Sequence, residues 1–124
     1  MASKAVLMKA FFEQITSFSK ELTEMYPDDA DFSLMLTTVQ LMKVTNPSIV
    51  VRTINANVGE FESKIMAKDE SFFLNYSFSE YGDVVEDVNV FTKLKQYIST
   101  MTPQTKENVW KYVQNITRLA KACS

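Results

Sequence analysis

The sequence contains no histidine and a single cysteine among its 124 residues. Histidine is the commonest general base and the commonest metal ligand, so its absence excludes Ser–His and Cys–His nucleophilic pairs. The single cysteine, Cys123, can form neither an internal disulfide nor a Cys/His zinc site. A single cysteine without a disulfide partner fits a reducing compartment, and we expect an intracellular protein. We interpret Cys123 as a frayed terminal thiol, with an intermolecular disulfide or redox contact as the alternative.

Glycine and long apolar runs are also scarce. Gly59 and Gly82 are the two glycines and stand far apart, so the glycine-rich loops that bind phosphates are missing. No apolar run approaches the roughly 20 residues of a membrane helix, and the first residues do not have the pattern of a secretory signal. We therefore predict that the protein is not an enzyme, uses no cofactor and does not insert into a membrane.

Acidic and basic residues nearly balance, at 15 and 13, and leave a net charge of -2. A nucleic-acid binder normally carries a basic face, so we do not expect nucleic acid as a partner. Carboxylates are the remaining candidates for a metal site, and they form two clusters: Asp28, Asp29 and Asp31, and Glu80, Asp83, Glu86 and Asp87. Neither cluster has the ligand spacing and central glycine of a calcium loop. Helix capping explains the first cluster and interaction with a helix dipole explains the second, and we predict no metal site.

Hydrophobic residues recur every three or four positions along five segments, which is the period of amphipathic helices. The first stripe is Leu7, Phe11, Ile15, Phe18, Leu22 and Met25; the second is Phe32, Met35, Leu36, Val39 and Met42; the third is Val50, Ile54, Val58, Phe61 and Ile65; the fourth is Val84, Val88, Phe91, Leu94, Ile98 and Met101; the last is Val109, Val113, Ile116 and Ala120, beside Trp110. We expect Trp110 to widen the last apolar face and to have a core or helix–helix packing role rather than an exposed one.

Capping residues and prolines mark where these helices begin. Ser3 precedes the first stripe, and Asp29 or Asp31 begins the second after Pro27 has ended the first helix. Asn46-Pro47 and Thr102-Pro103 each read as a cap followed by proline in the first helical position. We expect Gly59 to bend or interrupt the third segment, and we place a short helix at 72–74. The prediction is an all-α, single-domain bundle of five to six helices spanning residues 1–124.

An aromatic segment without clear periodicity lies between the third and fourth stripes. Its rings are Phe72, Phe73, Tyr76, Phe78 and Tyr81. Aromatic residues on irregular segments are typical anchors of protein interfaces, so we predict that these five residues bind a partner. The alternative is that they close one end of the helical bundle. Acidic neighbours such as Glu70 and Asp83 would repel phosphate, which argues against nucleic acid here.

Short motifs also occur at Met25–Asp29, Asn46-Pro47, Asp69–Leu74 and Val109–Val113. In these motifs the chain resembles uncharacterised small helical proteins of large DNA viruses of algae and protists. The resemblance implies a virus-encoded protein in the host cytoplasm or in a virion, and it supplies no catalytic residue.

The function predicted from these features is a non-catalytic protein–protein interaction or structural assembly module, for example a small virion component or an adaptor. It would bind a protein partner or a second copy of itself. The alternative is a small-ligand or regulatory binding domain with an apolar cavity between its helices. An assembly module exposes an apolar patch, whereas a ligand binder encloses a pocket.

Overall fold

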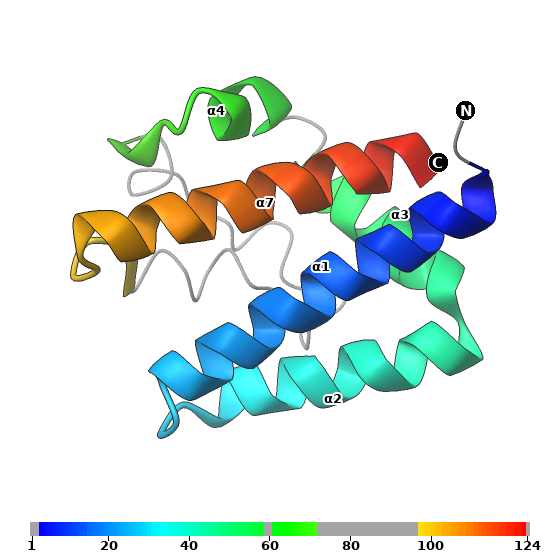
Figure 1. Cartoon of the computed structure of the whole chain (residues 1–124), viewed down its shortest axis with the longest axis horizontal. Coiled ribbons are helices and arrows are strands. Elements are labelled where there is room, and N and C mark those ends of the chain that lie inside the picture. The colour runs from blue at the N-terminus through cyan, green and yellow to red at the C-terminus, as the bar shows by residue number, and fades with distance from the viewer. Residues whose placement is uncertain (1–2, 59–60, 72–96, 124) are drawn as a thin grey trace.

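The computed structural model describes residues 3–58, 61–71 and 97–123, and these residues are helical with no strand (Figure 1). They form five helices: α1 (Lys4–Met25), α2 (Ala30–Thr45), α3 (Pro47–Val58), α4 (Glu62–Met66) and α7 (Pro103–Cys123). The prediction of an all-α fold is confirmed.

The helices begin where the capping signals predict. The Ser3 hydroxyl accepts the backbone N–H of the residue three positions on at 3.2 Å. The Asp29 carboxylate accepts the N–H of the residue two positions on at 3.1 Å, and the Thr102 hydroxyl caps α7 at 3.2 Å. Pro47 and Pro103 occupy the first positions of their helices, where a missing N–H costs nothing. The start of each of these four helices is therefore specified locally by the sequence.

Helix α1 packs against two partners, α2 and α7. It runs antiparallel to α2, and the C-terminal end of α7 lies near the N-terminal end of α1 (Figure 1). Helix α3 contacts both α2 and α7, while α4 packs on α7, on the side away from α1. Helix α2 forms the lower edge of the molecule in this view. Among the described helices, none is long and apolar enough to cross a membrane.

One cluster of buried side chains joins all five helices and the segment that precedes α7. The predicted stripes supply most of it. Its members are Phe11, Phe12, Ile15, Phe18, Leu22, Phe32, Met35, Val39, Val50, Val51, Ile54, Val58, Phe61, Ile65, Ile98, Met101, Val109, Trp110, Val113, Ile116, Ala120 and Cys123. Trp110 lies in this cluster, as expected for a residue with a core or helix–helix role.

The ends of α3 and α7 bear on two of the predictions, the continuity of the third stripe and the state of Cys123. The third stripe is divided between two helices, since α3 ends at Val58 and α4 begins at Glu62. The interpretation of Cys123 as a frayed thiol was wrong, because α7 extends to this residue and its side chain is only 3% exposed. Burial raises the pKa of the Cys123 thiol, and the charge of Lys4 opposes this shift more weakly. A buried, protonated thiol is a poor nucleophile.

Candidate functional site

The five aromatic residues predicted to bind a partner, Phe72, Phe73, Tyr76, Phe78 and Tyr81, lie outside the described residues. Their role stays a prediction. The described chain leads up to them along the surface of α7. Two ion pairs link this part of the chain to α7: Glu70 pairs with Lys106 at 2.9 Å, and Lys68 pairs with Glu107.

The described surface has a second candidate for protein binding, the outer side of α2. The inner side of this helix supplies Phe32, Met35 and Val39 to the core. The outer side nevertheless carries large apolar side chains. Leu34 is 48% exposed, and Leu41 is 57% exposed. A helix that is hydrophobic all round is normally covered all round, so α2 has one face without a described neighbour.

The outer apolar residues of α2 form one line along the helix. Ala30, Leu34, Thr37, Leu41 and Val44 follow one another at steps of four, three, four and three residues. We call these five residues the α2 seam. Steps of four and three are the spacing of the positions that pack together in coiled coils. All five residues are exposed, with Val44 at 83%. The seam is therefore a ready-made packing surface for another helix.

The hydroxyl groups on this side of α2 are already hydrogen-bonded within the helix. Ser33 donates to the Ala30 carbonyl, Thr37 to the Ser33 carbonyl and Thr45 to the Leu41 carbonyl, each at 3.0 Å. A hydroxyl that keeps its partner costs much less to remove from water than one that loses it. The two threonines also keep their methyl groups for packing. Covering the seam would therefore not leave these hydroxyl groups without a hydrogen-bond acceptor.

Sequence reasoning assigned only one apolar face to α2 and missed the seam. A signal for it was present, because no charged residue occurs between Asp31 and Lys43. An ordinary surface helix carries charge on its outer face, so an uncharged stretch of three turns indicates that both faces pack.

A cleft lies at the turn between α1 and α2 and has a volume of about 530 Å³. The Tyr26 and Tyr97 rings stack there with centroids 4.0 Å apart, and the Tyr97 hydroxyl donates to Asp29 at 2.6 Å. The capping role predicted for Asp29 is confirmed, and the same carboxylate also fixes Tyr97 in place. The cleft is rimmed by Asp28 and Asp31. Within the described ranges, no group of three acidic or cysteine side chains could hold a metal ion.

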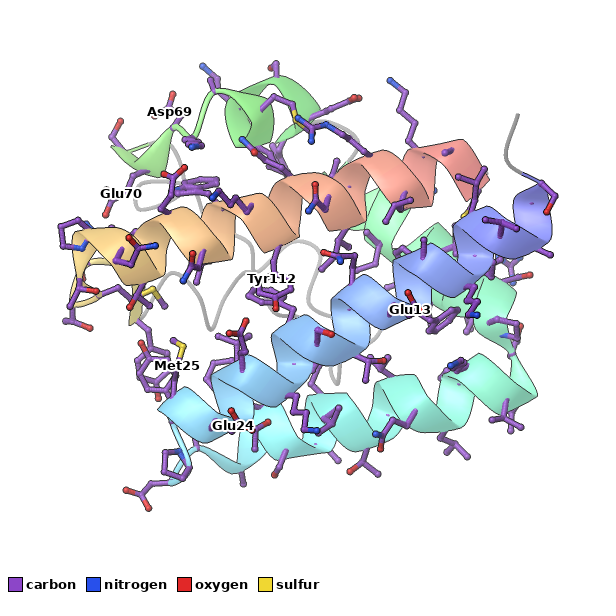
Figure 2. All side chains as sticks on the ribbon, viewed as in Figure 1. Glu13, Glu24, Met25, Asp69, Glu70 and Tyr112 are labelled. Atoms are coloured by element: carbon purple, nitrogen blue, oxygen red, sulfur yellow. The ribbon has the colours of Figure 1, made fainter. Side chains whose placement is uncertain are left out.

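A polar groove of about 360 Å³ runs between α1 and α7. Tyr112 stacks on Phe18 with ring centroids 5.2 Å apart and lies between the two helices (Figure 2). Its hydroxyl donates a hydrogen bond to the Glu21 carboxylate, and this bond together with burial raises the pKa of Tyr112 to about 12. The remaining lining residues are Gln14, Asn108, Lys111 and Asn115.

Four described titratable groups have a pKa that is displaced further from neutral pH. Burial raises the pKa of Tyr26 and of Cys123, and Tyr112 shifts in the same direction. A hydrogen bond from Lys68 lowers the pKa of Glu107. General acid–base catalysis uses groups whose pKa lies near the working pH, and the shifts of these four groups move their pKa values away from it.

Helix α4 is tied to α7 by polar contacts on its flank. The Gln114 amide donates to the Ile65 and Met66 carbonyls at 3.2 Å each, and Lys121 pairs with Glu62 at 3.1 Å. These bonds satisfy carbonyls at the C-terminal end of α4. They explain how so short a helix keeps its place.

Comparisons with known proteins give no relative. No protein-family model matches the chain, and neither a curated protein nor a solved structure matches it.

Proposed function

We propose that this protein is a non-catalytic protein–protein interaction or assembly module and that the α2 seam is one of its docking surfaces. The observation that carries the proposal is an uncharged line of four apolar residues and one threonine on the exposed side of a helix whose other side already packs in the core. Contiguous apolar surface of this kind marks interaction sites on soluble proteins. Internally bonded hydroxyls lower the cost of covering it.

A non-catalytic role is supported by the residues that could do chemistry. The chain has no histidine. Several lysines and carboxylates on α4 and α7 are engaged in ion pairs at the surface, such as Lys121 with Glu62. Exposed ion pairs of this kind contribute little energy because solvent screens them, and they do not tune a catalytic group.

The ligand-binding alternative requires an enclosed apolar cavity. Among the described residues, the cleft beside Tyr97 and the groove beside Tyr112 are both open. Three aspartates contribute to the lining of the cleft, and acidic, amide and lysine side chains form most of the lining of the groove. Open clefts of this kind differ from the enclosed apolar pockets typical of small-molecule sites. This difference favours the interaction module.

Two earlier predictions remain part of the proposal. The aromatic segment from Phe72 to Tyr81 is a second docking surface, because its rings are of the type that anchors interfaces. The resemblance to small viral proteins adds that the module acts in the host cytoplasm or in a virion as an adaptor or structural component.

Site-specific photo-crosslinking in the native cell tests the docking role of the seam. A photoreactive benzoylphenylalanine residue replaces Leu41, which is exposed in the seam. As a control, the same residue replaces Lys20, which is exposed on α1. We expect a discrete protein adduct from position 41 and none from position 20. If both positions give the same adducts, or neither gives one, the α2 seam is not a docking surface.

A further inference from the structure

We propose that the partner of the α2 seam is the α2 seam of a second copy, packed antiparallel about a two-fold axis near Thr37. This inference rests on the proposed function, because it names the occupant of the same surface. Its support comes from the order of residues along the seam, from the charges at the two ends of α2 and from the size of the surface.

The seam reads nearly the same in both directions. A two-fold interface must be self-complementary, so that a residue i contacting j implies that j contacts i. With the axis near Thr37, Leu34 lies three residues before it and Leu41 four residues after it, so Leu34 comes within one residue step of the partner's Leu41 and packs beside it. Ala30, which is small, then faces the partner's Val44, which is larger. These are pairings of apolar residues in both halves, and Thr37 lies against its own copy with its hydroxyl already bonded to the Ser33 carbonyl.

The charges of α2 favour the antiparallel direction. The N-terminal end carries Asp28, Asp29 and Asp31, and the last turn carries Lys43. A parallel pair would bring the acidic ends of the two copies together, which like charges oppose. An antiparallel pair puts the acidic end of one copy at the same end as the partner's Lys43. It also sets the two helix dipoles in opposite directions, which is the favourable arrangement.

The size of the seam predicts a weak dimer. Fourteen residue steps separate Ala30 and Val44, and a helix rises 1.5 Å per residue, so the contact is about 21 Å long and about 10 Å wide. This footprint is well below the roughly 800 Å² that each partner buries in a standard stable interface. We therefore expect association in the micromolar range or weaker, which a measurement on dilute protein would miss.

Light scattering on the full chain across micromolar to millimolar concentration measures the mass directly. We expect the mass to rise toward that of a dimer. Leu41→Glu places a carboxylate against the partner's Leu34, and this unpaired charge should weaken the dimer about tenfold or more. Ser17→Glu adds the same charge on the exposed side of α1 and should associate as the parent does. Circular dichroism of both variants confirms that they fold.

Disulfide trapping reports the direction and does not depend on the Leu41 variant. In a Cys123→Ala background, Thr37→Cys should form an intermolecular disulfide, because this position meets its own copy on the axis. Val44→Cys should not, because the axis separates the two copies of this residue by the length of the seam. Trapping at both positions would mean a parallel pair and would overturn the antiparallel arrangement.

Failure of this inference can be told apart from failure of the proposed function. A monomer at all concentrations, combined with an adduct of a different protein at position 41 in cells, overturns the second copy as occupant and leaves the docking surface standing. Flotation with phosphatidylcholine vesicles that Leu41→Glu abolishes would identify a lipid surface and overturn both proposals. A monomer with neither a cellular adduct nor vesicle binding also overturns both.

Discussion

Asp29 holds together two parts of the chain that are far apart in sequence, and Asp29→Ala tests how much this costs. One carboxylate oxygen accepts the Asp31 N–H at 3.1 Å, and the other accepts the Tyr97 hydroxyl at 2.6 Å. Loss of an N-cap costs about 1 kcal/mol. A hydrogen bond to a charged acceptor that is partly exposed contributes about another 1 kcal/mol. We therefore expect Asp29→Ala to lower the free energy of unfolding by about 2 kcal/mol.

Urea unfolding followed by far-ultraviolet circular dichroism measures this loss. With a slope of about 2 kcal/mol per molar urea, the midpoint should fall by about 1 M. Asp28→Ala is the matched control, because it removes the same charge from the neighbouring exposed residue. Its effect should stay within about 0.5 kcal/mol.

The contact with Tyr97 can be isolated by a double-mutant cycle. Tyr97→Phe removes the hydroxyl and keeps the ring that stacks on Tyr26, so we expect a loss of about 1 kcal/mol. Because both single changes break the same bond, the double variant should lose about 1 kcal/mol less than the sum of the two. Strict additivity, or equal effects of Asp28→Ala and Asp29→Ala, would refute the reasoning.

Three further outcomes follow from the described contacts. Val39→Ala should lower the free energy of unfolding by about 2 kcal/mol, because Val39 is fully buried. Val44→Ala, on the exposed side of α2, should change it by less than about 0.5 kcal/mol. Urea titration measures both changes. The folded pKa of Tyr112 is raised by Glu21 from 10.0 to about 12, so its contribution to stability is complete below pH 10.0 and is lost as the pH rises toward 12. Solvent screening limits this loss to about 1 kcal/mol, and Tyr112→Phe should remove it from the melting curves measured across this range. Cys123 should react slowly with a thiol reagent in buffer and at the rate of a free thiol in urea, and fast reaction of the folded protein would contradict its burial.

The helices and most of their boundaries follow from the sequence itself. Ser3, Asp29 and Thr102 act on N–H groups two or three residues away, and Pro47 and Pro103 act on their own backbone. Such signals are complete within one helical turn, so they can be read without knowing the fold. The apolar stripes likewise identify core residues, because burial of one side of a helix needs only the helical period.

Contacts between distant segments were decided by the tertiary structure. Asp29 and Tyr97 are 68 positions apart, and no local pattern pairs an aspartate with that tyrosine. The burial of Cys123 depends on α7 continuing into the packed core, which a terminal position in the sequence does not indicate.

Helix α2 shows the division most clearly. The absence of charge between Asp31 and Lys43 is a property of the sequence, and it predicts that two faces of the helix avoid water. Which face packs on α1 depends on the shape and position of its neighbours. The structure places Val39 inside and leaves Val44 exposed, because the described neighbours of α2, α1 and α3, cover the inner side alone.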